Sequence, residues 1–143
     1  MSTFDEVKFK LWNNVDAVVS LIQRWNPKNC KTEKDHEKSL YEYLHKEFDT
    51  IQVTKQYAKG RIKADLVIGG EKGIIIEIKR NLTARAEYQR LIGQLVEYKE
   101  WAGSVIVLLA GSIDLNFKKQ LEKSSETENK VQFLETKFTI VQK

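Results

Sequence analysis

Two short apolar runs with a helical segment between them constrain the fold most. Residues 104–110 form a continuous apolar run, which is typical of a strand covered on both faces of a sheet, and residues 74–79 begin with three isoleucines, as in the middle of a buried strand. Between them, residues 83–101 carry apolar side chains at helical spacing, and Gly103 ends that pattern. A helix that joins two buried strands is the crossover of a parallel pair, so the sequence predicts an α/β fold with a mixed sheet.

Similar patterns on either side of this unit complete the order of elements. The expected helices cover residues 4–25, 32–48, 83–101 and a short segment around 113–121. The expected strands cover residues 50–58, 61–68, 74–79, 104–110 and part of 131–141. Thr32 and Asp35 resemble a capping box at the start of the second helix. In the second strand, the period of two places Ala64 with Leu66 on one face and Asp65 on the other.

The chain has the size of one ordinary domain. It has 143 residues, of which 41% are hydrophobic and 31% charged, with no internal repeat and no linker. We therefore expect a single domain over residues 1–143. Its parts are an N-terminal amphipathic helix (1–27), a core (32–110), and a C-terminal helix and strand (111–143).

Composition favours a cytoplasmic protein with a polyanionic partner. The single cysteine, Cys30, excludes an internal disulfide, and no zinc-ligand spacing is present. The first residues lack the apolar core of a signal peptide, and the run VIVLLA from Val105 is too short to cross a bilayer, so no membrane partner is expected. The net charge of +4 favours a polyanionic partner such as nucleic acid.

Charged residues inside an apolar strand are the strongest functional signal. Glu77 and Lys79 share one face of the strand at 74–79. If that strand forms a hairpin with residues 61–68, Asp65 lies close to Glu77. Two adjacent carboxylates repel each other unless one takes up a proton or a cation lies between them. Mg²⁺ is bound by one or two carboxylates with a carbonyl and waters, so this pair is a candidate metal site.

Two helices present polar groups toward the same strands. Glu37 precedes Leu40 and Leu44 at helical spacing, which places it on the buried face of its helix. Glu33, one turn earlier, is the alternative acid. Gln94 borders the apolar face of the helix at 83–101.

These residues together resemble the PD-(D/E)XK phosphodiesterase superfamily. The resemblance is carried by Glu37, Asp65 in GRIKADLVI, the Glu77-Ile78-Lys79 triplet, and Gln94 with Tyr98 in QLVEY. It covers about residues 32–110, and Ala64 stands where the motif has proline. It is closest to the exonucleases of recombination helicase-nucleases and to small resolvases. It implies a restriction-endonuclease-like αβββαβ core, with a central mixed sheet flanked by helices and an extra N-terminal helix.

The resemblance also implies a reaction and a role for each residue. The implied catalytic set is Glu37, Asp65, Glu77, Lys79 and Gln94. Mg²⁺ or Mn²⁺ would be held by Asp65, Glu77, the carbonyl of Ile78 and, directly or through water, Glu37. Lys79 would orient or deprotonate the attacking water or stabilise the phosphorus, and Gln94 would position Lys79 or the nucleophile. The implied reaction is metal-dependent hydrolysis of phosphodiester bonds, with DNA as the expected substrate.

Basic residues near this edge suit a nucleic-acid backbone. The residues expected to contact nucleic acid are Lys63, Arg80, Arg85, Arg90 and Tyr98. Phosphate contacts of this kind give sequence-independent, salt-sensitive binding.

Other interpretations of the same residues remain open. Glu77 and Lys79 can form a plain salt bridge, and Glu37 can be solvated like its neighbours Lys34 and Lys38. The fold can serve as a catalytically silent nucleic-acid-binding or assembly module. A third alternative is a structural subunit, since Trp12, Val19 and Leu21 extend the apolar face of the first helix toward a partner. A homodimer would suit a resolvase, and an ATPase or helicase partner is a further alternative.

Overall fold

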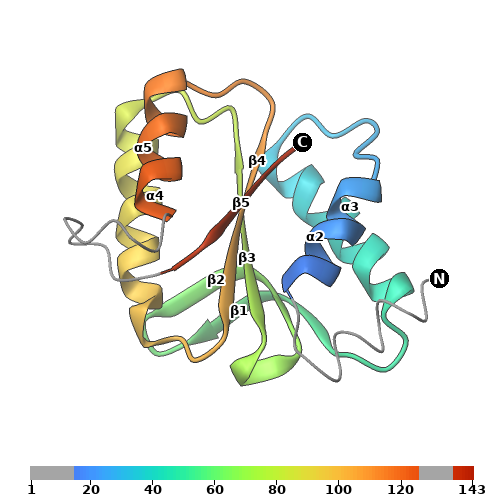
Figure 1. The fold of residues 1–143 in the computed structure, drawn as a ribbon. Helices are drawn as coiled ribbons and strands as arrows, with labels where there is room; N and C mark the ends of the chain where they lie inside the picture. The colour runs from blue at the N-terminus through green and yellow to red at the C-terminus, as the bar shows by residue number, and fades with distance from the viewer. Residues whose placement is uncertain (1–14, 126–136) are drawn as a thin grey trace.

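The computed structural model describes residues 15–125 and 137–143 (Figure 1). Residues 4–14 of the first expected helix, including Trp12, lie outside the described residues. So do residues 131–136 of the last expected strand.

A five-stranded mixed sheet forms the centre of the molecule, as the sequence predicts. The strands, in spatial as well as chain order, are β1 (Val53–Lys59), β2 (Ile62–Ile68), β3 (Ile74–Arg80), β4 (Ser104–Ala110) and β5 (Thr139–Gln142). The first three are antiparallel, whereas β3, β4 and β5 are parallel. The expected crossover between the two apolar strands is therefore confirmed.

In the described part of the chain, four α-helices flank the sheet, two on each face. Helices α2 (Val15–Arg24) and α3 (Glu33–Glu47) cover one face, and α4 (Arg85–Glu97) and α5 (Leu115–Ser125) cover the other (Figure 1). Short 3-10 helices occupy Gly70–Lys72 and Tyr98–Glu100. The order α3-β1-β2-β3-α4-β4 matches the expected αβββαβ core, and α2 is the additional N-terminal helix.

Each face of the sheet has its own hydrophobic core. On the α2/α3 face, Ile74, Ile76 and Ile78 of β3 are fully buried, as their alternation predicts. Ile75 packs on the α4/α5 face. All seven positions of β4 are buried or half-buried, because both of its faces are covered by helices.

Helix α2 belongs to the core. Leu21 is only 1% exposed and packs with Val18 and Ile22 against the α3 side of the sheet. Val19 is half-buried against the same core. The expectation that Leu21 contributes to an exposed apolar patch is therefore wrong. The buried surface of α2 is wider than the single row of apolar side chains at helical spacing, and it includes Leu21.

The start of α3 is fixed by the predicted capping box. The N–H of Asp35 donates to Thr32 Oγ1 at 3.0 Å, and the N–H of Thr32 donates to Asp35 Oδ2 at 3.2 Å. One turn of this helix is also tied to the sheet, because the N–H of Arg80 donates to Glu33 Oε2 at 3.1 Å. The first turn of α3 thus lies at the carboxyl end of β3.

The hairpin of β1 and β2 bends at its middle, which alternation did not predict. Ala64 packs on the α4/α5 face, whereas Leu66 packs on the α2/α3 face, so these two residues do not share a face. Gln56, which stands opposite Asp65 in the register, has a φ of 52°. This left-handed conformation turns β1, and the pairing of β2 with β3 ends at Leu66 and Ile76.

Beyond the bend, the hairpin packs under the end of α4. The ring of Tyr57 meets Trp101 edge-on, with 5.7 Å between centroids. The hydroxyl of Tyr98 donates to the carbonyl of Lys63 at 2.7 Å. Trp101 Nε1 donates to the Gly73 carbonyl at 3.0 Å, which also anchors the turn before β3.

Two glycines offer a matched test of this packing. A Cβ at Gly73 would lie 1.8 Å from the Ile68 carbonyl oxygen, whereas a Cβ at Gly93, within α4, would meet nothing within 4 Å. We expect Gly73→Ala to lower the free energy of unfolding by roughly 2 kcal/mol or more. We expect Gly93→Ala to raise it by up to about 1 kcal/mol, because alanine is the better helix former. Urea denaturation followed by tryptophan fluorescence measures both, and equal stability of the two variants would contradict the packing described.

Candidate metal and nucleic-acid site

The bend in the hairpin opens the sheet between β2 and β3. Past the last pair, Leu66 and Ile76, the N–H of Ile78 has no partner in the β2 backbone. Asp65 Oδ2 accepts its hydrogen instead, at 2.8 Å. The carboxyl group of Asp65 therefore stands where a strand carbonyl would be, within the opened part of the sheet.

The structure brings Asp65 and Glu77 together in this space. Their side chains hydrogen-bond to each other. Glu77 is only 1% exposed, and a carboxyl in such a place is charged only at a high energetic cost.

Burial and mutual repulsion favour a retained proton. Burial, followed by the negative charge of Asp65, raises the pKa of Glu77 from its ordinary 4.5 to about 8. Burial also raises the pKa of Asp65, and the charge of Glu37 adds to this, although the Ile78 N–H opposes it. At neutral pH the pair holds one proton that two separate carboxyls would have lost.

Tyr98 completes the surroundings of Glu77 from the α4 side. Its hydroxyl lies within hydrogen-bond distance of both the Lys63 carbonyl and Glu77, and only 2% of the residue is exposed. Its one hydrogen serves one of these contacts, and the proton retained by the carboxyl pair can serve the other. Burial, and then the nearby Glu77 carboxylate, raise the pKa of Tyr98, so it stays a neutral donor. The prediction that Tyr98 contacts nucleic acid is therefore wrong, because its ring and hydroxyl are used inside the protein.

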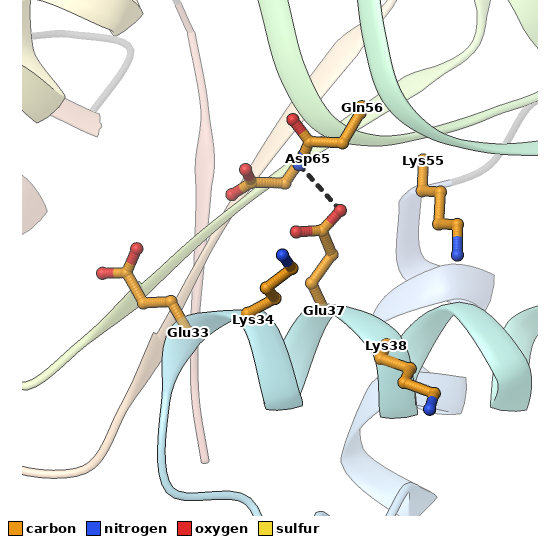
Figure 2. Close-up of a pocket in the computed structure, with 7 residues that line it drawn as sticks. All are labelled: Glu33, Lys34, Glu37, Lys38, Lys55, Gln56 and Asp65. Atoms are coloured by element: carbon orange, nitrogen blue, oxygen red, sulfur yellow. Dashed lines mark hydrogen bonds between the residues drawn. The ribbon is translucent and has the colours of Figure 1, made fainter.

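A pocket of about 560 Å³ opens from Asp65 toward α3. Its lining residues come from α3 and the hairpin: Glu33, Lys34, Glu37, Lys38, Lys55, Gln56 and Asp65 (Figure 2). Glu37 is half-buried, and its Oε1 accepts a hydrogen bond from Gln56 Nε2 at 2.8 Å. Figure 2 shows Glu37 and Asp65 reaching into the pocket from opposite sides. Glu37 therefore lies toward the site, not in bulk solvent.

Three lysines of this pocket were not among the predicted site residues. Lys34 and Lys38 flank Glu37 on α3, and Lys55 lies across the pocket on β1. Figure 2 shows Lys34 directed toward the acids, with Lys38 and Lys55 directed away from them. The ammonium of Lys55 also lies 5.0 Å from the centre of the Tyr41 ring. Lys34 stands three residues before Glu37 and shares its helix face, whereas Lys38 follows it directly, so spacing along α3 alone does not mark both lysines as pocket residues.

Lys79 and Gln94 lie on the α4 side of the sheet. Lys79 is half-buried, and its charge opposes the raised pKa of both Asp65 and Glu77. Among residues 15–125 and 137–143, it forms no ion pair with Glu77, whose hydrogen-bond partners are Asp65 and Tyr98. Gln94 Oε1 is buried without a hydrogen-bond partner in the same part of the chain.

The structure does not gather the other predicted nucleic-acid contacts in one place: Arg80 and Arg85 lie at the end of β3 and in the first turn of α4, whereas Lys63 lies under the C-terminal end of α4. Lys63, Arg85 and Arg90 are exposed, and Arg80 is half-buried. Of these, Arg85 lines a second groove, on the α5 side of the sheet.

The acids suit a cation that needs few protein ligands. Within the described residues, no group of three or more His, Cys, Asp or Glu side chains is arranged to hold a metal ion. A complete protein cage is thus not present there. A carboxyl pair with surplus negative charge beside an open pocket matches Mg²⁺ or Mn²⁺, which keep several waters.

Comparison with known proteins identifies no family. No protein-family model and no curated protein matches the sequence. The solved structure of SfsA from Pyrococcus furiosus in complex with Ca²⁺ aligns with 76% of the residues of this chain, at 17% sequence identity and a TM-score of 0.41. The match covers 54% of the SfsA chain, so this chain spans about half its length. None of the helices in the described ranges has the length and apolar character needed to span a membrane.

The carboxyl pair predicts a characteristic pH dependence of stability. Between pH 4.5, the ordinary pKa of Glu77, and about 8, the folded chain binds more protons than the unfolded chain. The stabilisation present at low pH is therefore lost progressively as the pH rises to about 8, by up to about 5 kcal/mol at about 1.4 kcal/mol per pKa unit. With a chelator present, Glu77→Gln should remove most of this dependence. Urea denaturation at pH 5 and pH 8.5 measures it, and identical pH profiles of wild type and variant would contradict the shifted pKa.

Proposed function

We propose that the chain is a metal-dependent phosphodiesterase of the PD-(D/E)XK type that hydrolyses nucleic acid, with DNA as its main substrate. The observation that carries this proposal is the Asp65–Glu77 pair in the opened sheet, beside Lys79 and the acid pocket. A structural ion pair would offset the charge of both acids, whereas the burial and mutual repulsion of this pair favour one retained proton and leave one negative charge.

The metal would occupy the place of that proton. Asp65, Glu77 and the carbonyl of Ile78 would hold Mg²⁺ or Mn²⁺, with Glu37 bound through water from the α3 side. The ion would lower the pKa of a bound water and offset charge on the phosphate.

The protein's own residues would orient the reacting groups. Lys79 places a positive charge beside the acids, where it can hold the attacking water or stabilise developing negative charge. Gln94 offers a buried oxygen to which no group among residues 15–125 and 137–143 donates, and the ammonium of Lys79 or a water would supply that hydrogen. Tyr98 fixes the orientation of Glu77 through its hydroxyl.

Lysines around the pocket would hold the substrate backbone. Lys34, Lys38 and Lys55 line the same pocket as Asp65, and their flexible side chains would reach an anion bound there. Such contacts are independent of sequence, and affinity should fall as salt rises.

A catalytically silent binding module is the second candidate. The observation in its favour is that the described residues contain no three-ligand metal cluster. A module of this kind would bind nucleic acid through the same lysines without cutting it.

Cleavage assays distinguish the two candidates. The assays use labelled linear, circular, single-stranded and four-way DNA, and RNA, each with Mg²⁺, Mn²⁺ or a chelator. We expect cleavage only with metal, and a loss of about 100-fold or more in Glu77→Gln and in Lys79→Ala, whose folds stay intact by circular dichroism. Lys46→Ala, at an exposed site in the last turn of α3, is the matched control. A fully active Glu77→Gln or Lys79→Ala would refute the assigned roles, and no cleavage of any substrate by wild type would favour the silent module.

Metal binding should release the shared proton. When Mn²⁺ is titrated at pH 6.5, the measured enthalpy should depend on the ionisation enthalpy of the buffer, because the carboxyl pair loses a proton on binding. At pH 9, above the pKa of Glu77, that dependence should be much smaller. Calorimetry in two buffers at each pH measures it. Equal proton release at both pH values, or unchanged binding by Glu77→Gln, would exclude Glu77 as a ligand.

A further inference from the structure

A second groove lies on the opposite face of the sheet from the acid pocket. It has a volume of about 390 Å³ and runs between the first turn of α4 and the outer face of α5. The polar residues that line it are Arg85, Asp114, Asn116, Lys119, Gln120 and Lys123. None of the proposed catalytic residues lines this groove.

The charge of the groove is positive. Arg85, Lys119 and Lys123 contribute three cations against the single carboxylate of Asp114. That carboxylate already caps α5, since its Oδ1 accepts hydrogen bonds from the N–H groups of Asn116, at 2.8 Å, and Phe117, at 3.2 Å. The positive groups therefore dominate the part of the groove that faces solvent.

Packing holds the basic face of α5 outward. The ring of Phe117 stacks on Tyr88 of α4, with 4.7 Å between centroids, and Leu121 is fully buried. These two contacts fix the rotation of α5 about its axis. Lys119 and Lys123, four residues apart, consequently share the exposed side.

The groove and the acid pocket lie at the same edge of the sheet. Helices α4 and α5 begin just after β3 and β4 end, and their loops are joined by the Ser112 N–H to Asn81 Oδ1 bond, at 2.8 Å. The first turn of α3 reaches this edge from the other face, through the bond from Arg80 to Glu33. Figure 1 shows α3 on one side of the sheet, and α4 and α5 on the other.

We propose that this groove binds the phosphodiester backbone of nucleic acid away from the bond that is cut. The inference takes its ligand class from the proposed function. Arg85 suits bidentate contact with a phosphate, the lysines act as point charges, and the amides of Asn116 and Gln120 add hydrogen-bond donors. A substrate that crosses the carboxyl edge of the sheet would then contact this groove on one face and the acid pocket on the other.

A pair of charge-matched double variants tests the groove. Lys119→Ala with Lys123→Ala removes two cations from it. Lys46→Ala with Lys99→Ala removes two from exposed sites near the C-terminal ends of α3 and α4. Binding to a labelled 30-nucleotide strand and to its duplex is measured by fluorescence anisotropy with a chelator, over a range of salt concentrations. Circular dichroism checks that both variants fold.

The groove variant should bind at least about 10-fold more weakly at low salt. Its slope of log affinity against log salt should be shallower by roughly 1.4 for the single strand and 1.8 for the duplex. The control should differ little from wild type in both quantities. Equal losses in the two variants would overturn the groove as a site, since they would reflect net charge alone.

Cleavage by the same proteins separates this inference from the proposed function. If the groove variant binds as wild type does while both cut, the groove proposal fails and the phosphodiesterase proposal stands. If binding depends on the groove but wild type cuts nothing with any metal, the phosphodiesterase proposal fails and the groove stands. Wild type that binds no nucleic acid would overturn the groove.

Discussion

Asp65 and Glu77 hold two carboxyl groups side by side, one of them almost wholly buried, and the surrounding residues must offset their charge. Around Asp65 and Glu77 the protein provides an N–H from Ile78, a hydroxyl from Tyr98 and the nearby charge of Lys79. None of these neutralises the pair fully, and a retained proton makes up the difference. Under the proposed function, a divalent cation would replace this proton.

This arrangement depends on one irregular residue in β1. Because Gln56 adopts a positive φ, the hairpin turns away from β3 after Leu66, and the sheet opens beside Asp65. The same turn brings Lys63 under the end of α4, where Tyr98 meets its carbonyl. A straight hairpin would continue the backbone ladder, and the Ile78 N–H would bond to a strand carbonyl instead of a carboxyl group. The strained backbone of Gln56 thus lies at the bend where the β2–β3 pairing ends and Asp65 bonds to the Ile78 N–H.

Much of the fold was predictable because it follows from regular periodicity. The alternation in β3, the crossover through α4 and the capping box of α3 all rest on local rules that the tertiary structure keeps. The alternation predicted for β2 failed, since a single left-handed residue in its partner strand reverses which face Ala64 occupies. No residue pattern marks Gln56 for that conformation, which is uncommon outside glycine and asparagine.

The site was less predictable where function depends on partners distant in the chain. The burial of Tyr98 follows from the hairpin tip that packs against it, and the lysines of the acid pocket gain a role only when β1 lies opposite α3. Spacing along one helix cannot reveal either relationship. Leu21 is likewise buried by residues distant in the chain, in α3 and the sheet, which the spacing along its own helix does not predict.

The hydroxyl of Tyr98 joins two parts of the protein that otherwise belong to separate layers. It contacts the Lys63 carbonyl in the outer half of the hairpin and Glu77 in the interior of the sheet. A displacement of that outer half would separate the hydroxyl from one of its two acceptors. The local opening of a surface hairpin and the proton affinity of an interior acid are therefore thermodynamically linked, and each will report on the other.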